Sequence, residues 1–497
     1  MPEPSSKGSR GAAREPHVVI LGAGPAGVGA AYQLRRFGKA RVTVVERGVA
    51  VGGNSGSFDG AGQRLDYGSH RLHPACDPEI LADIRGLLGA DLLDRPRHGR
   101  IHLRGKLIHF PLKPVDLLLR LDRGFALGTL GDMARKAVAK PSEGSTFASV
   151  LWANLGPTIC RDFYFPYARK IWGRAPEELS GIQARRRVSA GSFGKLVKKV
   201  LSAVPGLKPA GAGRFFYPRQ GFGQISEAYA GAAQERGAEF LMGWTVTALE
   251  RAEGNGHGNG QGDGNSDGAR WSVTAERDGE GRALRADYVW STIPISLLAR
   301  AMRPAPPEAV LRAAGEIEYR AMILVYLELD VDQFTEYDAH YFPDAGIAIT
   351  RLSEPKNYAA LSEPRGQTTL CAELPCSPSD AWWEMSDEEL GRQVAADLAR
   401  AGLPLARPPV RVRTKRLRQA YPVYLNGYEA PFGTLDGWAS SVPDLLTYGR
   451  QGLFAHDNTH HALAMAYRAA ECLVDGRFDE RRWAEHRKVF ETHVVED

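Results

Sequence analysis

The stretch Val18-Val19-Ile20-Leu21-Gly22-Ala23-Gly24-Pro25-Ala26-Gly27 decides the fold of this 497-residue chain. Four consecutive apolar residues are typical of a buried strand, and the glycine pattern after them opens a helix of small residues. A second apolar strand, residues 42–46, ends on Glu46. The order strand, glycine turn, helix, strand predicts a βαβ unit of a dinucleotide-binding domain.

The three glycines of the turn each meet a steric requirement of nucleotide binding. Gly22 makes the tight turn, Gly24 lets the backbone approach a pyrophosphate, and Gly27 permits close packing of the helix on the strand. The N-terminus of that helix attracts phosphate groups. We expect Glu46 to accept hydrogen bonds from both hydroxyls of an adenosine ribose. An acidic residue there disfavours NADP and leaves NAD and FAD as candidates.

A second glycine pair, Gly52-Gly53, follows the strand that ends on Glu46. A chain that passes close beneath a flavin and its ribityl group needs residues without side chains at this point. An NAD dehydrogenase has no such requirement there. The sequence therefore predicts FAD as the cofactor.

The composition disfavours several classes of protein. The chain has 63 basic and 58 acidic residues, interspersed without the basic stripe that binds nucleic acid. The spacing of its five cysteines fits neither a redox CxxC nor a zinc pair, so we expect a reducing compartment and no metal site. No apolar run reaches the roughly 18 residues of a membrane span. We therefore expect a cytoplasmic protein without a membrane partner, with a disordered tail over residues 1–16.

The strand and helix patterns predict an α/β fold whose Rossmann-like FAD-binding domain is discontinuous in sequence. Its three segments are expected at residues 17–75, 211–300 and 421–497, with a helical insertion at 76–210 and an antiparallel-sheet substrate domain at 301–420. Residues 78–93 and most of 114–201 are expected as helix. Residues 239–249 are expected as one strand paired with 270–275, 254–265 as a flexible loop, and 449–474 as strand, turn and helix.

Further motifs follow in order along the chain: Val51-Gly52-Gly53-Asn54, Tyr67-Gly68-Ser69-His70-Arg71-Leu72-His73, Tyr167-Ala-Arg-Lys-Ile-Trp172, Thr350-Arg351-Leu-Ser-Glu354-Pro-Lys356, Tyr421-Pro422 and Gly449-Arg450. Together with the glycine turn, these motifs resemble the UDP-galactopyranose mutases. Those flavin enzymes belong to the wider superfamily of amine oxidases and protoporphyrinogen oxidases. The resemblance implies an FAD enzyme whose cofactor site is closed by the last segment of the chain.

The resemblance also implies which residues contact FAD. They are Gly22, Gly24, Pro25, Ala26 and Gly27 of the turn, Glu46, Arg47, Gly52, Gly53 and Asn54 after the second strand, Gly68, Ser69 and His70, then Val246, and finally Gly449, Arg450, Asp457 and Asn458. His70 is expected to lie against the flavin and to tune its reduced state or hold a sugar.

In the mutases the substrate is a nucleotide sugar, and the resemblance extends to residues that would bind one here. Arg186 and Arg450, with Arg351 as a third, are expected to hold the diphosphate, because a guanidinium binds phosphate oxygens bidentately. Tyr167, Trp172, Tyr421 and His456 would complete the substrate site. The implied reaction is a pyranose to furanose isomerisation through a reduced-flavin N5 adduct, with NAD(P)H as a candidate external reductant.

Two other functions stay open at this point. A net redox enzyme of the amine oxidase or protoporphyrinogen oxidase type would take a hydride from a small molecule on the same fold. A catalytically silent flavin-binding protein would need the cofactor residues alone. The chain also departs from the mutase pattern. His456 stands where the mutases have a diphosphate-binding tyrosine, and Asn458, with Asp457 beside it, stands where they have an aspartate.

Overall fold

A five-stranded parallel sheet forms the core of the first domain, in the order β20-β13-β1-β2-β9. The computed structural model describes residues 14–110, 116, 120–138, 144–187, 213–252 and 269–495. The strands are β1 (His17–Leu21), β2 (Arg41–Glu46), β9 (Glu239–Met242), β13 (Tyr288–Ser291) and β20 (Leu445–Thr447). They come from all three segments expected for the FAD-binding domain. The Rossmann-like α/β fold, discontinuous in sequence, is therefore confirmed.

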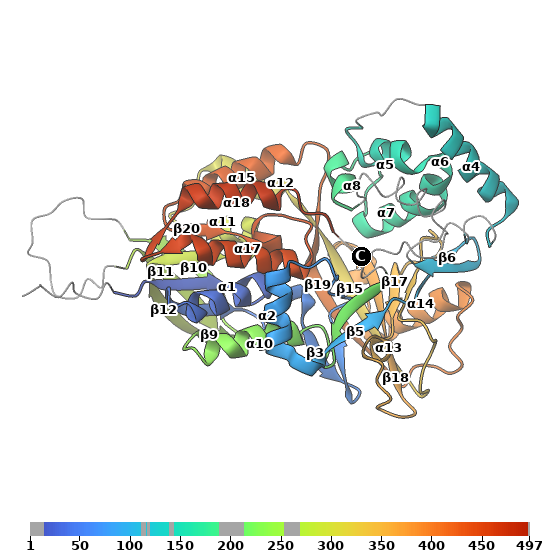
Figure 1. Ribbon diagram of the computed structural model, residues 1–497, viewed down its shortest axis with the longest axis horizontal. Helices are drawn as coiled ribbons and strands as arrows, with labels where there is room; N and C mark the ends of the chain where they lie inside the picture. Colours follow the sequence, from blue (N-terminus) through green and yellow to red (C-terminus); the bar gives the residue numbers. More distant parts are fainter. Residues whose placement is uncertain are drawn as a thin grey trace, which may run out of the picture.

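Helix α1 (Pro25–Arg36) packs between α10 (Gln224–Gln234) and α17 (Thr459–Cys472) (Figure 1). A Cβ atom on Gly27 would lie 1.9 Å from the carbonyl oxygen of Gly22, and one on Gly29 would lie 2.8 Å from Leu463. The backbone of α1 thus approaches its neighbours more closely than a side chain allows. Glycine at these positions is a requirement of packing.

The expected strand 239–249 is two strands. Gly243, with φ of +79°, ends β9 and redirects the chain, so β9 joins the parallel sheet and β10 (Thr245–Arg251) leaves it. The pairing of β10 with β11 (Trp271–Arg277) agrees with the expectation. β12 (Glu280–Ala286) and β14 (Met302–Arg303) complete this four-stranded sheet. The single long strand was wrong because a glycine with a positive φ interrupts the apolar pattern.

The sheet expected in the substrate domain is present and has seven strands, in the order β19-β15-β18-β17-β16-β6-β7, with every pair antiparallel except β16 and β6. Its strands are β15 (Glu318–Leu329), β16 (Ala339–Tyr341), β17 (Arg351–Ser353), β18 (Thr368–Cys376), β19 (Arg411–Val423), β6 (Gly99–Leu103) and β7 (Lys106–Phe110). The hairpin β6–β7 lies within the region assigned to the helical insertion. It joins the sheet through a parallel pairing with β16, a long-range contact that the local sequence pattern does not reveal.

The helical insertion is shorter than expected. Helix α2 (Pro78–Leu88) starts as predicted but ends before Gly89, which has φ of +53°. Residues 92–96, expected in part as helix, form β5 (Leu92–Pro96) and pair with β8 (Arg214–Pro218). The helices that follow are α4 (Arg123–Val138), α5 (Phe147–Leu155), α6 (Pro157–Ile159), a π-helical turn at Cys160–Tyr164, α7 (Phe165–Trp172) and α8 (Gly181–Arg187). They form the separate body at the upper right of Figure 1.

The last segment returns the chain to the middle of the molecule. The strand expected after residue 449 lies earlier, at β20, and Gly449 instead starts α16 (Gly449–Gly452), which leads into α17. After α18 (Glu480–Phe490), the Val495 amide donates to the carbonyl oxygen of Arg186, 2.8 Å away. Figure 1 shows the described chain ending between the three bodies. The remaining elements are β3 (Ser57–Gly60), β4 (Gln63–Asp66), α11 (Ile295–Ala301), α12 (Glu308–Glu316), α13 (Pro355–Ala359), α14 (Asp387–Arg400), α15 (Glu429–Ser441), β21 (Leu473–Val474) and β22 (Arg477–Phe478).

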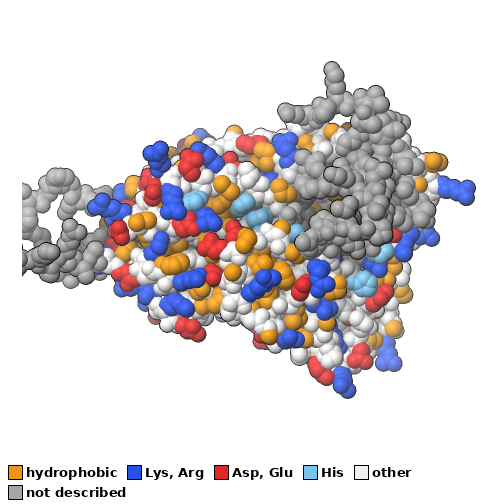
Figure 2. All heavy atoms as spheres, in the orientation of Figure 1, with side chains coloured by type: hydrophobic (Ala, Val, Ile, Leu, Met, Phe, Trp, Pro, Cys, Tyr) orange, Lys and Arg blue, Asp and Glu red, His pale blue; other side chains and the backbone are white. Residues whose placement is uncertain are grey.

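The surface agrees with the interspersed charges of the sequence. Figure 2 shows basic and acidic side chains alternating over the face that it draws. All five cysteines are buried and free. None of the helices in the described parts of the chain is long and apolar enough to cross a bilayer. The expected loop at 254–265 and residues 1–13 of the expected tail lie outside the described residues.

We predict that Gly27→Ala destabilises the protein strongly. The new methyl group overlaps the Gly22 carbonyl oxygen, and relieving that overlap requires α1 to move off the sheet, at a cost of about 3 kcal/mol. Gly86→Ala is the matched control, because Gly86 lies in α2 with no atom within 4 Å of the added Cβ. Urea unfolding followed by circular dichroism should show a lower midpoint for Gly27→Ala alone. Equal midpoints for the two variants would contradict the proposed packing.

Candidate active site

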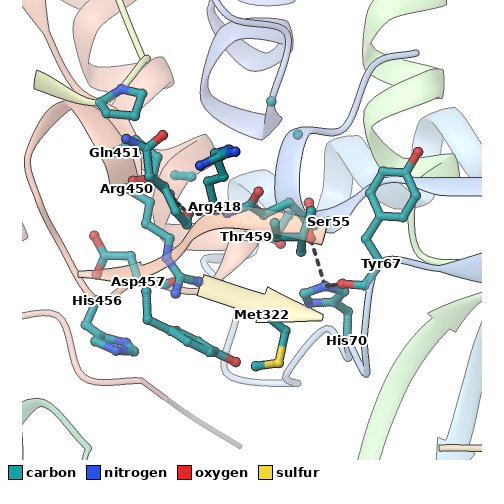
Figure 3. Close-up of a pocket in the computed structure, with 18 of the residues that line it drawn as sticks. Ser55, Tyr67, His70, Met322, Arg418, Arg450, Gln451, His456, Asp457 and Thr459 are labelled. Carbon is teal, nitrogen blue, oxygen red and sulfur yellow. Dashed lines mark hydrogen bonds between the residues drawn. The ribbon is translucent and has the colours of Figure 1, made fainter. Parts of the chain in front are cut away.

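A cavity of about 1420 Å³ lies where the parallel-sheet domain, the seven-stranded sheet and the helical body meet. Pockets for drug-sized ligands are typically about 300–1,000 Å³, so this cavity has room for a dinucleotide and a second molecule. Figure 3 shows part of it. Ser55, Tyr67 and His70 lie on one side, Arg450, His456 and Asp457 lie on the other, and Met322 lies between them.

Two glycine loops face each other at the floor of the cavity. The Gly52 amide donates to the carbonyl oxygen of Ala23 at 2.8 Å. A Cβ atom on Gly53 would lie 3.2 Å from the Cα of Gly24, and Gly24 would place its own Cβ 3.9 Å from Gly53. Both loops line the cavity with bare backbone next to the N-terminus of α1. This surface suits the close approach of a pyrophosphate.

Glu46 fixes the loops that surround it. One carboxylate oxygen accepts from the Ala23 amide at 2.8 Å and the other accepts from the Gly48 amide at 2.7 Å. Each oxygen can accept a further hydrogen bond, and Glu46 lines the cavity. Arg47 and Val246 line the same end. These positions match those expected for the adenosine part of FAD.

The closing segment packs directly on the glycine turn. Gly449 has φ of +77°, and a Cβ there would lie 2.7 Å from the Cβ of Ala26. Asn458 and His461 form a capping box at the start of α17, in which the Asn458 amide donates to Nδ1 of His461. Arg450, Asp457 and Asn458 all line the cavity. The structure thus brings together the first and last parts of the predicted FAD site.

His70 is held as a neutral imidazole with a defined tautomer. Its Nε2 lies 2.9 Å from the carbonyl oxygen of Tyr67 and 3.1 Å from that of Asn54, so Nε2 carries the hydrogen. The ring stacks on Phe222 with centroids 5.3 Å apart. Burial lowers the pKa of His70 below its usual value, although the nearby Asp66 carboxylate opposes this shift. His70 is therefore an uncharged wall of the cavity at neutral pH.

Arg351 lines the cavity, but its charge is compensated. Its guanidinium lies 2.8 Å from the Glu373 carboxylate, and the same carboxylate oxygen accepts the Ser69 amide at 2.8 Å. The Glu373 carboxylate helps to raise the pKa of Arg351 well above its usual value, against the opposing effect of burial. Glu373 was not among the site residues expected from the sequence. A signal was present, because Glu373 is the one charged residue in the apolar strand β18.

An aromatic group lies beside Arg450. The Tyr421 ring stacks on His456 with centroids 5.5 Å apart, and Trp172 meets His456 edge to face at 4.9 Å. The guanidinium of Arg450 lies 5.0 Å from the Tyr421 ring centroid and donates to the Ala420 carbonyl oxygen at 2.9 Å. With Tyr167, these residues line the cavity as the sequence predicted. They come from α7, β19 and the closing segment.

Arg186 is placed differently from the other predicted site residues. It is not among the described residues that line the cavity. Its guanidinium lies 5.6 Å from the Tyr424 ring centroid and donates to the Tyr424 hydroxyl at 3.3 Å. Residues 188–212, which follow it, lie outside the described part of the chain. The role of Arg186 in substrate binding stays a prediction.

The sequence also gave no indication of the apolar side of the cavity. Six residues of the helical body and the adjoining hairpin form this surface, which we call the apolar wall: Phe110, Phe147, Leu155, Ile159, Phe163 and Ile171. The same residues pack in or against one hydrophobic core, so their apolar pattern alone indicates only burial. Their exposure to the cavity depends on how the helices pack.

We predict that Gly24→Val folds but loses its FAD. A Cβ at Gly24 meets no protein atom closer than 3.9 Å, so the side chain would occupy the space of the pyrophosphate instead of disturbing the protein. Gly231→Val is the control, because Gly231 lies on α10 with no atom within 4 Å. Circular dichroism and the flavin absorbance of the purified proteins measure both properties. A yellow Gly24→Val protein with full flavin content would contradict the assigned site.

Known proteins support the cofactor and the fold. The sequence matches the family described as flavin containing amine oxidoreductase over residues 25–474. A phytoene dehydrogenase of Streptomyces griseus is 27% identical over 270 residues. That alignment covers 48% of this chain and 49% of the dehydrogenase, so it spans about half of that relative.

Two solved structures illustrate the similarity in fold. Reduced UDP-galactopyranose mutase has a TM-score of 0.79 at 19% identity, with 97% of this chain and 99% of that chain covered. Cyclohexylamine oxidase from Brevibacterium oxydans has a TM-score of 0.64 at 19% identity, with 93% and 99% covered. The family match extends over most of the chain, from Pro25 within the glycine turn to Val474 in the closing segment. The chain therefore belongs to the flavin containing amine oxidoreductases and is an enzyme whose cofactor is FAD.

Proposed function

We propose that this enzyme is an FAD-dependent oxidoreductase whose substrate is a small molecule with a sizeable apolar or aromatic portion. The observation that carries the proposal is the apolar wall, which lines the same cavity as Met322 and the predicted flavin site. Burying apolar substrate surface there contributes roughly 25 cal/mol per Å². When bound, FAD supplies two-electron redox chemistry.

The charges near the predicted flavin site support a substrate that is not a dianion. Arg71 lies 3.0 Å from Asp338, and Arg351 lies 2.8 Å from Glu373, so these two cavity-lining arginines form buried ion pairs. Arg450 lines the cavity together with the Asp457 carboxylate. Breaking either buried pair to bind a diphosphate would leave a carboxylate without its partner, which is strongly unfavourable.

In this proposal the residues of the chain position the substrate and exclude water. The apolar wall holds the apolar portion, and the Tyr421, His456 and Trp172 rings give the reacting part a flat surface. Neutral His70 fixes the backbone at Asn54 and Tyr67 by donating to their carbonyl oxygens. Arg450, which lies against the Tyr421 ring, would orient a polar group of the substrate.

A second candidate is the isomerisation of a nucleotide sugar. One observation favours it: Arg450 lies against the stacked pair of Tyr421 and His456, an arrangement that could hold a sugar next to a phosphate. In this case Arg186 would have to reach the cavity from its present position on Tyr424. The two candidates differ in whether electrons are consumed.

We predict that an apolar amine, alcohol or unsaturated hydrocarbon bleaches the oxidised flavin anaerobically, whereas sugar nucleotides do not. Ile171→Thr should weaken this donor about tenfold, because it places a hydroxyl group on the apolar wall. Val410→Thr makes a comparable change at an exposed site and should leave the donor unaffected. The opposite result would favour the mutase function instead. In that case no donor bleaches the flavin, and the dithionite-reduced enzyme interconverts the pyranose and furanose forms of a nucleotide sugar without consuming reductant.

We also predict that Arg450→Ala retains FAD but lowers kcat/KM about 100-fold, or about 2.7 kcal/mol, through loss of a preorganised charge. Gln451→Ala is the matched control. Gln451 also lines the cavity and donates to a β19 carbonyl, that of Gln419 at 2.8 Å, but it carries no charge. Steady-state kinetics and flavin content distinguish the variants. An equal loss in both would assign the effect to the contact with β19 instead of to the charge.

A further inference from the structure

A row of directly opposed residues crosses the seven-stranded sheet on the side of the cavity. From β18 to β7, Glu373 is paired with Arg351, Arg351 with Tyr341, Tyr341 with Ile101, and Ile101 with Ile108. Directly opposed residues carry their side chains on the same face of a sheet. Glu373, Arg351, Tyr341 and Ile101 all line the cavity. The side chain of Tyr341 therefore lies on the face of the sheet that borders the cavity.

Tyr341 stands where this row changes from charged to apolar. On one side of it lies the ion pair of Arg351 with Glu373. On the other side lie Ile101 and Phe110 of the hairpin β6–β7. The Phe110 ring, which belongs to the apolar wall, lies 4.3 Å from the Tyr341 ring between centroids. A ligand that lies on the apolar wall at Phe110 is therefore next to Tyr341.

The hydroxyl group of Tyr341 is held by Arg71. One terminal nitrogen of Arg71 donates to the Tyr341 hydroxyl oxygen at 3.1 Å, and the other lies 3.0 Å from the Asp338 carboxylate. Because a guanidinium has no acceptor atom, the hydroxyl hydrogen must point elsewhere. Tyr341 donates it to no residue that the structure describes, although only 6% of Tyr341 is exposed. Buried polar groups are normally hydrogen-bonded, so this hydrogen is available to a ligand in the cavity.

We infer that Tyr341 binds the substrate by donating a hydrogen bond from its hydroxyl group to an oxygen or an uncharged nitrogen atom. Under the proposed function, on which this inference rests, the substrate then has a hydrogen-bond acceptor next to the portion that lies on the apolar wall. An uncharged acceptor suits this position, because the neighbouring Arg351 is already paired with Glu373. Donation from Arg71 polarises the phenol and strengthens the hydrogen bond that the phenol donates.

Ligand binding without turnover tests the role of Tyr341 separately from the proposed oxidation. The oxidised, FAD-loaded protein is titrated with acetophenone and with ethylbenzene, which has a methylene group in place of the carbonyl, and the change in flavin absorption measures binding. We expect the preference for acetophenone over ethylbenzene to fall about tenfold in Tyr341→Phe, the size of one hydrogen bond. Infrared difference spectra should show a lowered carbonyl stretching frequency for acetophenone bound to the wild type.

Tyr358→Phe is the matched control. The Tyr358 hydroxyl also accepts from Arg71, at 3.2 Å, but it shares a second hydrogen bond with Ser69. Tyr358 is not among the described residues that line the cavity. We expect Tyr358→Phe to keep the wild-type preference for acetophenone.

The flavin content of each variant reports whether it is folded. An unchanged preference in flavin-loaded Tyr341→Phe, or an equal loss in both variants, would overturn the role of Tyr341. So would a wild type that does not bind acetophenone, or that binds it with an unshifted carbonyl stretch. Failure of every donor to bleach the flavin would instead count against the proposed oxidation.

Discussion

The close approach of two bare stretches of backbone, at Gly24 and Gly53, is the constraint on which the rest of the site depends. The Gly52 amide bonds to the Ala23 carbonyl oxygen, and Glu46 accepts from the Ala23 amide, so both loops and the end of β2 form one rigid unit. Any side chain between the loops would fill the path predicted for the pyrophosphate. The closing segment then packs on the same unit through Gly449 and Ala26, which places Arg450 over the cavity.

Charge compensation determines what the remaining space can bind. The ion pairs Arg71 with Asp338 and Arg351 with Glu373 are almost fully buried, and such pairs are maintained because each charge would be costly alone. They fix loops and strands around the cavity while contributing little net charge to it. The cavity also has other charged side chains, among them Glu46, Lys415, Arg418, Arg450 and Asp457, while its apolar wall offers a surface for the uncharged part of a ligand.

The sequence predicted the site unevenly, and the physical reasons are clear at particular residues. The glycine motifs could be read from their spacing, whereas His70, Arg351, Tyr421 and His456 were expected from the resemblance to the mutases, and the structure brings all of them to one cavity. The helix predicted through residue 93 ends at Leu88, because β5 is formed by its pairing with β8, far along the chain. Arg186 was expected in the substrate site, but its guanidinium donates to the Tyr424 hydroxyl.

By itself the sequence determined the dinucleotide-binding unit and its cofactor. Gly22, Gly24 and Gly27 express a steric requirement that acts within a few residues and can therefore be read locally. Only the tertiary structure decided that Glu373 compensates Arg351, that the apolar wall lines the same cavity as the predicted flavin site, and that His493 lies near Asp457. These relations join elements far apart in the chain, and packing between domains, which leaves no local pattern, brings them into contact.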